Sequence, residues 1–189
     1  MTAARARLGV GMAGYAFMGA SHSQAWRSAG RFFDLPLAPD MVALCGRNTD
    51  AVSAAATKLG WASVETDWKQ LIRREDIDLI DVCTPGESHA EIAIAALEAG
   101  KHVFCEKPLA NTVSEAQAMV AAAEQASAKG VRSMVAFNYR RVPALALAKR
   151  LVEQGRLGTI RRLWHTLRGA GVARVADETG LIGVIMIGM

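Results

Sequence analysis

The sequence predicts an α/β protein built on a doubly wound parallel sheet. From residue 8 to about residue 137, short apolar runs rich in β-branched residues alternate with amphipathic runs of helical period, the pattern of parallel strands covered by helices. A glycine-rich turn follows the first apolar run. The chain has 189 residues and is 51% hydrophobic, which is enough for one core and part of another. We therefore expect one α/β domain followed by a short remnant of an α+β domain.

Charge and composition argue against two classes of partner. The formal net charge is +4, but the basic residues are scattered, and the notable basic pairs away from helix faces are Arg140-Arg141 and Arg161-Arg162. A phosphate backbone needs a clustered basic stripe, so we expect no nucleic-acid partner. No apolar run is long enough to span a membrane, and frequent glycines distinguish the run after Arg7 from a signal peptide. We expect no membrane partner either.

Cysteine usage indicates a reducing compartment. The chain has three cysteines, Cys45, Cys83 and Cys105, an odd number without the spacing of a metal site. Each of them ends an apolar, strand-like run. We interpret them as buried, reduced thiols of a cytoplasmic protein without a metal site.

The elements of the sheet follow in order along the chain. The predicted strands are residues 8–13, 41–45, 79–83, 102–105 and 133–137. Two intervening helices carry capping-box spacing at their starts, Ser88 with Glu91 and Thr112 with Glu115. Glycines at positions 100 and 130 follow these helices, where a left-handed cap is favoured. Further on, Pro143 opens a helix to about residue 154, and residues 159–164 have the pattern of one more strand.

The glycine turn after the first strand permits two registers. Gly9, Gly11 and Gly14 match GxGxxG literally, but the residues before Gly9 are poor strand sequence. We favour the register in which residues 8–13 form the strand, Gly14 turns the chain, and Gly19 lets the next helix pack on the sheet. Free amides at the start of that helix would then bind a pyrophosphate. The predicted contacts are Gly14, Ala16, Phe17, Met18 and Gly19, with Ala16 in place of the middle glycine.

The end of the second strand indicates which nicotinamide cofactor is bound. An acidic residue there would hydrogen-bond the adenosine ribose, but the sequence reads Cys45-Gly46-Arg47-Asn48. Because a guanidinium can bond two phosphate oxygens at once, Arg47 favours NADP over NAD, and we expect Arg47 and Asn48 to contact the cofactor. A solvated arginine at the end of a strand is the alternative interpretation of Arg47.

A possible catalytic lysine follows the strand at residues 102–105. That strand delivers Glu106 and Lys107 to the carboxyl edge of the sheet, where α/β proteins place their ligands. A lysine at this edge can take part in proton transfer. Taken alone, a Lys-Pro pair also suits a surface lysine before a proline turn. Its position at the end of a strand favours the functional interpretation.

These segments together resemble the Gfo/Idh/MocA family of oxidoreductases. The resemblance covers about residues 8–162 and is carried by the glycine turn and by Thr84-Pro85-Gly86-Glu87-Ser88-His89, Glu106-Lys107-Pro108, Phe137-Asn138-Tyr139-Arg140-Arg141 and Glu153-Gln154-Gly155-Arg156-Leu157-Gly158.

The family resemblance implies a fold, a chemistry and further site residues. It implies a Rossmann domain at residues 1–137 that binds NADP or NAD, then the start of a substrate and oligomerisation domain at 138–164 and an atypical tail at 165–189. Family members transfer hydride between a nicotinamide and sugars, cyclitols or related polyols. By resemblance Lys107 handles the hydroxyl proton, a cis peptide can precede Pro108, and members form homo-oligomers. Also by resemblance, cofactor contacts include Thr84, Pro85, His89, Glu106, Lys107 and Asn138.

The chain departs from the family after about residue 162. Family members are roughly twice as long, and the histidine and aspartate with which their second domain assists proton transfer have no match here. We expect from this that the catalytic set is incomplete and that the tail reflects a truncation or a change of reading frame. Two functions stay open: a sugar or polyol dehydrogenase, and a nucleotide-binding module that holds NAD(P) without turnover.

Overall fold

The computed structural model describes residues 6–159 of the chain. The chain divides into two compact units, Met1–Phe137 and Asn138–Met189. Within the described residues, no helix combines the length and apolar character needed to cross a membrane.

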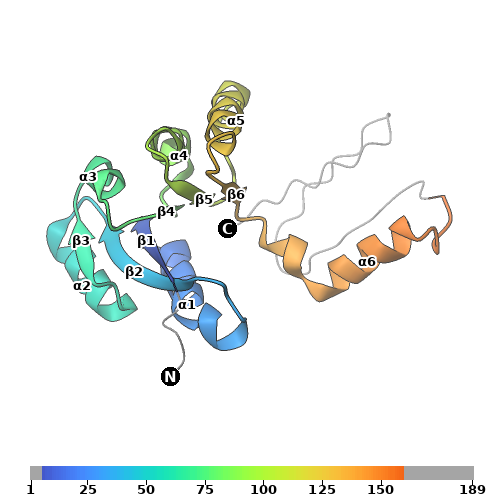
Figure 1. Cartoon of the computed structure of the whole chain (residues 1–189), viewed down its shortest axis with the longest axis horizontal. Helices are drawn as coiled ribbons and strands as arrows, with labels where there is room; N and C mark the ends of the chain where they lie inside the picture. Colours follow the sequence, from blue (N-terminus) through green and yellow to red (C-terminus); the bar gives the residue numbers. More distant parts are fainter. Residues whose placement is uncertain (1–5, 160–189) are drawn as a thin grey trace. The chain divides into compact units, whose positions relative to one another are not determined.

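The first unit is a parallel sheet with a helix or turn after almost every strand (Figure 1). Its elements in chain order are β1 Arg7–Ala13, α1 Phe17–Phe32, β2 Ala38–Cys45, α2 Thr49–Leu59, β3 Ser63–Glu65, α3 Trp68–Arg73, β4 Leu79–Val82, the 3-10 turn η1 Gly86–Ser88, α4 His89–Glu98, β5 His102–Cys105, α5 Val113–Ser127 and β6 Ser133–Val135. The strands lie in the order β3-β2-β1-β4-β5-β6 and every pairing is parallel. This is the strand order of a doubly wound dinucleotide-binding sheet, whose order reverses between β1 and β4, so the predicted α/β fold is confirmed.

Two apolar clusters cover the two faces of the sheet. On one face, α3, α4 and α5 pack through residues such as Leu71, Ile92 and Met119. On the other face, α2 packs through Val52 and α1 contributes partly buried residues, among them Trp26. Figure 1 shows this separation, with α3, α4 and α5 above the sheet and α1 below it. The layers leave the strand ends at the carboxyl edge free to carry a site.

Most predicted strands are present, with small differences at their ends. β2 begins at Ala38, earlier than the predicted start at residue 41. Its first residues, including Pro39, pair with β1 and not with β3. The β2–β3 pairing starts at Ala43, so the missing N–H of Pro39 interrupts no ladder. β3, which the sequence did not indicate, is a three-residue strand with two polar positions and therefore lacks an apolar signature.

One of the two predicted capping boxes is present and the other is wrong. Thr112 accepts the Glu115 N–H at 3.2 Å and the Glu115 carboxylate accepts the Thr112 N–H at 2.9 Å. Ser88 makes no cap bond to α4, because η1 runs directly into the helix and leaves Ser88 near φ −106° and ψ −1° instead of extended. Its hydroxyl donates to Thr84 Oγ1 at 2.7 Å instead.

The second unit contains the short turn η2 Asn138–Arg141 and the helix α6 Pro143–Glu153. Pro143 occupies the first turn of α6, as predicted. Gly155 follows the helix with a φ of 68°, the left-handed conformation that favours glycine. Apart from Thr159, the strand predicted at 159–164 and the tail at 165–189 lie outside the described residues.

Candidate functional site

The register of the sheet brings four strand ends to one edge. Ala13 pairs with both Cys45 and Val82, and Val82 pairs with Cys105. The ladder continues one residue further, because the N–H of Gly14 donates to Cys45 O at 3.0 Å and that of Glu106 donates to Val82 O at 2.9 Å. The loops after β1, β2, β4 and β5 therefore leave the sheet at the same level, which is where this fold binds ligands.

The turn after β1 depends on two glycines with no room for a side chain. Gly14 has a φ of 98°, and a Cβ there would lie 2.6 Å from Cys83 O. A Cβ on Gly19 would overlap the carbonyl oxygen of Gly14. Gly9 and Gly11 lie inside β1, so the literal GxGxxG match is a decoy and the favoured register is confirmed. The glycines let β1, the β4 loop and α1 approach backbone to backbone.

The start of α1 has the properties of an anion site. Ala16 is its N-cap and provides no side-chain acceptor, and no acidic residue lies in the first turn. The first N–H groups of a helix lack partners within the helix and carry a partial positive charge. Phe17 opens the helix with 79% of its surface exposed, and Met18 is half-buried. The predicted pyrophosphate contacts thus form one continuous backbone turn.

The loop after β2 carries the predicted adenosine-side residues. Gly46 lies against the ring of Tyr15, which a Cβ at Gly46 would overlap. Arg47 is exposed. The side chain of Asn48 accepts the Ala51 N–H at 2.9 Å and caps α2. Asn48 therefore has a structural task, and Arg47 is the side chain of the pair that is available to a ligand.

Thr84 and Pro85 form the turn after β4, and His89 holds that turn in place. His89 is only 1% exposed. Its Nε2 lies 2.8 Å from Thr84 O and its Nδ1 lies 2.8 Å from Pro108 O. His89 thus joins the β4 loop to the loop after β5.

Glu106 and Lys107 follow β5, and the Lys107–Pro108 peptide bond is cis. Glu106 is 5% exposed and Lys107 is half-buried. The Glu106 carboxylate accepts the backbone N–H of Lys107 at 3.0 Å and lies 3.1 Å from His22 Nε2. Over residues 6–159 no ion pair joins the Glu106 and Lys107 side chains, so the carboxylate anchors the lysine through its backbone.

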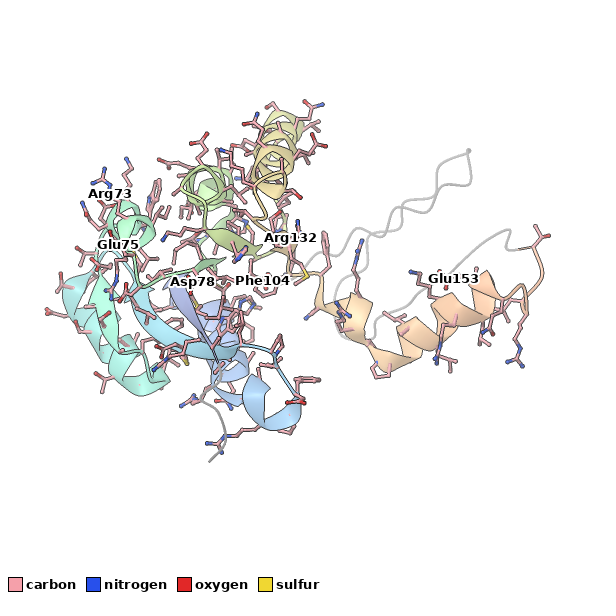
Figure 2. All side chains as sticks on the ribbon, in the orientation of Figure 1. Arg73, Glu75, Asp78, Phe104, Arg132 and Glu153 are labelled. Atoms are coloured by element: carbon pink, nitrogen blue, oxygen red, sulfur yellow. The ribbon has the colours of Figure 1, made fainter. Side chains whose placement is uncertain are left out.

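A buried polar cluster, which no sequence motif predicted, lies behind Glu106. Asp81, in the middle of β4, is 0% exposed. Its carboxylate accepts the Trp26 indole N–H at 2.7 Å, and both of its oxygens lie 3.0 Å from His22 Nδ1. The His22 ring stacks on Phe104, with the centroids 5.3 Å apart; Figure 2 labels Phe104 on β5. A carboxylate inside an otherwise apolar strand is the sequence signal that could have revealed this cluster, because buried charges need partners.

Electrostatics in this cluster favour a protonated His22. Burial lowers the pKa of His22, but the hydrogen bond and charge of Asp81 and the charge and hydrogen bond of Glu106 outweigh it, and the net pKa lies above 6.5. Cys83 Sγ lies 3.2 Å from His22 Nδ1. Burial, followed by the charge of Asp81, raises the pKa of Cys83, so its sulfur stays a neutral thiol.

The geometry of His22, Asp81 and Cys83 also resembles a set of metal ligands. Each of the three already contacts another member of the set, at 3.0 to 3.4 Å. The ligand form of a cysteine is its thiolate, and in the metal-free fold burial raises the pKa of Cys83. Burial and the neighbouring carboxylates raise the pKa of Cys105 to about 12 as well. The three cysteines are buried and free, as expected.

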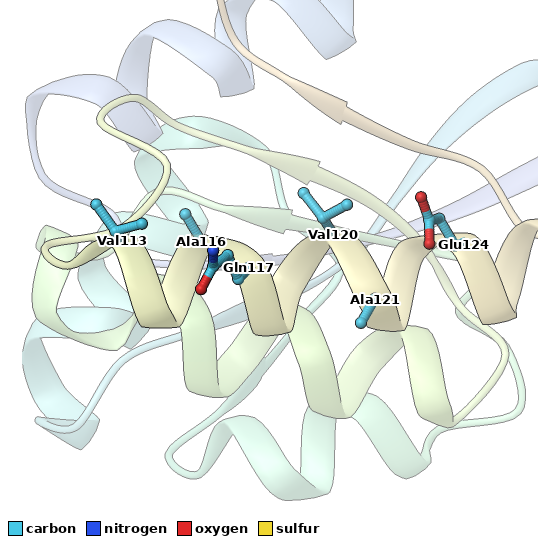
Figure 3. A pocket seen from close by; sticks show the side chains of 6 residues that line it. All are labelled: Val113, Ala116, Gln117, Val120, Ala121 and Glu124. Carbon is cyan, nitrogen blue, oxygen red and sulfur yellow. The ribbon is translucent and has the colours of Figure 1, made fainter.

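Two surface hollows lie beside α5. One runs along the outer side of α5 and is lined by Val113, Ala116, Gln117, Val120, Ala121 and Glu124 (Figure 3). The other lies between α5 and the β5–β6 edge of the sheet, beside Met119 and Met134. Neither is lined by the glycine turn, the Thr84-Pro85 turn or Lys107. Asn138, the remaining predicted contact, lies exposed in η2 of the second unit.

Fold and loop geometry together define a dinucleotide-binding α/β domain, and comparison with known proteins gives the family. Residues 8–137 match the family model for the oxidoreductase family with an NAD-binding Rossmann fold, Gfo/Idh/MocA. The chain belongs to this family.

Individual relatives extend the likeness beyond the family model. The chain is 45% identical to levoglucosan dehydrogenase of Pseudarthrobacter phenanthrenivorans over 81% of this chain and 39% of that protein. The crystal structure of an oxidoreductase domain protein from Kribbella flavida is 70% identical, with a TM-score of 0.81 over 82% of this chain and 42% of the other. A levoglucosan dehydrogenase complex with NADH and levoglucosan is 44% identical, with a TM-score of 0.76 over 80% and 40%. The chain thus spans about 40% of the length of these proteins.

Proposed function

We propose that this chain is the cofactor-binding part of a nicotinamide-dependent dehydrogenase acting on a sugar, cyclitol or related polyol. The observation that carries the proposal is the backbone cradle after β1, where Gly14 and Gly19 exclude any side chain. Such a cradle lets a pyrophosphate approach the first amides of α1. The 44% identity to a complex holding NADH and levoglucosan supports both the cofactor class and the substrate class.

We assign the cofactor contacts to the loops at the carboxyl edge. Gly14, Ala16, Phe17, Met18 and Gly19 would hold the pyrophosphate through their amides. Arg47 would face the adenosine ribose, and Thr84 and Pro85 the nicotinamide ribose. When bound, the cofactor supplies the hydride acceptor or donor. Asn138 remains a proposed contact from the second unit.

We assign proton transfer to Lys107. As a neutral amine it would accept the hydroxyl proton when the substrate gives up hydride, and as an ammonium it would return that proton in the reverse direction. Glu106 supports this role indirectly, since its carboxylate fixes the Lys107 amide at 3.0 Å. His89 supports it from the other side by holding the carbonyl of Pro108 at 2.8 Å.

A titration of the 189-residue chain with NADH by calorimetry tests the cofactor assignment. The proposal expects saturable binding of one NADH per chain. Gly30→Ala is a control for a glycine substitution elsewhere in the same helix. A Cβ at Gly30 meets nothing within 4 Å, so this variant should bind NADH like the wild type. Absence of heat from folded protein with both NADH and NADPH would contradict the proposal.

Turnover separates the dehydrogenase from the alternative, a module that binds cofactor without catalysis. In that alternative the described residues hold the cofactor and Lys107 takes no part in proton transfer. NADH formation is measured with NAD and levoglucosan, D-apiose or inositol. Turnover that Lys107→Ala abolishes supports the enzyme. Tight NADH binding with no turnover on any of these compounds supports the module.

Two observations support different choices between NAD and NADP as the preferred cofactor. The exposed Arg47, with no carboxylate at the end of β2, supports NADP, as the sequence analysis predicts. The NADH complexes of levoglucosan dehydrogenase, at 44% identity, support NAD. We propose NAD as the preferred cofactor, because likeness over the whole domain outweighs one exposed side chain. The dissociation constants of NADPH and NADH test this choice. If NADPH binds more tightly than NADH, and Arg47→Ala removes that preference, NADP is the preferred cofactor instead.

A further inference from the structure

The buried cluster around His22 reaches the proposed catalytic segment through a continuous chain of contacts. His22 Nδ1 lies 3.0 Å from Asp81 on β4, and His22 Nε2 lies 3.1 Å from Glu106 Oε1 after β5. The other oxygen of that carboxylate, Glu106 Oε2, accepts the Lys107 N–H at 3.0 Å. Three contacts therefore connect the centre of the sheet to the backbone of Lys107.

The same ring belongs to the helix that follows the glycine turn. His22 lies in the second turn of α1, whose first turn begins at Phe17. Phe104 holds the ring from the β5 side through stacking at an interplanar angle of 24°. The ring therefore links α1 to the loop that carries Lys107.

The protonation state of the His22 ring determines whether it can donate a hydrogen bond to both the Asp81 and the Glu106 carboxylate. A neutral imidazole donates through one nitrogen, whereas the imidazolium donates through both. The titratable groups facing the ring are Asp81 and Cys83 from β4 and its loop and Glu106 from the end of β5. Asp81 also accepts from Trp26 and Cys83, whereas Glu106 Oε1 faces Nε2 of the His22 ring. Loss of the Nε2 proton would therefore remove the hydrogen bond from His22 to Glu106.

We propose that His22 is a positioning residue of this site, which as an imidazolium ties Asp81 to Glu106 and thereby fixes the backbone of Lys107. The functional meaning of this link rests on the proposed role of Lys107, but the link itself does not require any cofactor to be present. Its direct consequence is that the Lys107 amide responds to the protonation of a side chain 85 residues earlier in the chain.

Nuclear magnetic resonance of the wild-type chain without cofactor tests the link directly. Two-bond proton–nitrogen correlations should show both His22 nitrogens protonated near pH 6.5. The Lys107 amide resonance should move as pH rises above 6.5, with the same midpoint as the His22 ring. A His22 ring that is neutral at this pH, or a Lys107 amide that does not follow it, overturns the proposal.

A pair of variants separates this coupling from a general structural effect. His22→Phe keeps an aromatic ring beside Phe104 but removes both nitrogens, so the pH-dependent movement of the Lys107 amide should disappear. His102→Phe is the control: His102 begins β5 at the opposite end from Glu106 and accepts the Arg132 N–H. That variant should retain the Lys107 movement with an unchanged midpoint. If His22→Phe does not fold, the wild-type measurements still decide.

The outcome is independent of the proposed function. NADH binding measured on the same wild-type sample shows whether the cofactor assignment holds. NADH binding with an unresponsive Lys107 amide rejects only the role of His22. A coupled Lys107 amide without NADH binding confirms the link and rejects the proposed function instead.

Discussion

The loop after β1 and the loop after β5 lie at the same edge of the sheet but are built in different ways. The first depends on missing side chains, because Gly14 and Gly19 bring backbones into direct contact. The second depends on side chains from distant elements: Glu106 is held by His22 from α1, and Pro108 by His89 from α4. The comparison suggests that recognition of the cofactor is a property of the backbone, whereas the position of Lys107 is a property of a buried polar network.

The largest effect is expected at the β1 loop. Gly14→Ala would combine a left-handed backbone, at φ 98°, with a Cβ only 2.6 Å from Cys83 O. Overpacking and left-handed strain together should lower the free energy of unfolding by roughly 2 to 5 kcal/mol. Urea denaturation followed by circular dichroism measures this.

Gly30→Ala is the matched comparison for Gly14→Ala. Gly30 lies inside α1 with open space where its Cβ would be. Replacing a glycine in a helix by alanine should raise the free energy of unfolding by about 0.5 to 1 kcal/mol. Equal effects of the two substitutions would show that the β1 loop is not specially constrained.

The next largest effect is expected in the polar network. Asp81→Asn removes a fully buried charge that faces His22, Trp26 and Cys83. Breaking a buried pair from one side should cost about 3 kcal/mol of stability. Asp76→Asn is the comparison variant, because Asp76 is mostly exposed and forms an ion pair with Arg74. It should lose much less stability. Thermal denaturation of the two variants compares them, and similar losses would contradict a special role for Asp81.

A smaller effect should follow pH. The folded-state pKa of His22 lies above its ordinary value of 6.5, so protonation of His22 stabilises the fold. This contribution is fully present below pH 6.5 and is lost as pH rises through the folded-state pKa. The stability difference between wild type and His22→Phe should therefore shrink above pH 6.5. A difference that grows with pH would mean that the ring is neutral in the fold.

The smallest effect on stability is expected at Lys107. Its side chain is half-buried and lacks an ion-pair partner among residues 6–159, so Lys107→Ala should change the unfolding free energy by no more than about 0.5 kcal/mol. NADH affinity should stay near that of wild type while any turnover disappears. Unchanged turnover in this variant would remove Lys107 from the proposed mechanism.

Local signals made the fold and the β1 loop predictable from the sequence. Alternating apolar and helical runs gave the sheet, and the glycine spacing together with the poor strand sequence before Gly9 gave the correct register. Thr112 with Glu115 was predictable for the same reason, since a capping box is a short-range pattern. The capping box predicted at Ser88 was wrong, because Ser88 belongs to η1 and its backbone is not extended.

The network around His22 was not predictable in the same way. His22 and Glu106 are 84 residues apart in sequence, and their contact follows from the strand order and from the packing of α1 on the sheet. Asp81 was visible as a charge inside an apolar strand, but its partners were not. The role of Asn48 as a helix cap was likewise hidden until the start of α2 was known.

The central claim is that the backbone at the carboxyl edge of this sheet binds a nicotinamide dinucleotide, and amide chemical-shift mapping during an NADH titration tests it most directly. The account predicts that the largest shifts fall on Gly14 to Gly19, on Thr84 and on Lys107, with residues of the α5 hollow such as Val120 unaffected. Saturable shifts confined to α5, with the β1 loop unchanged, would contradict it.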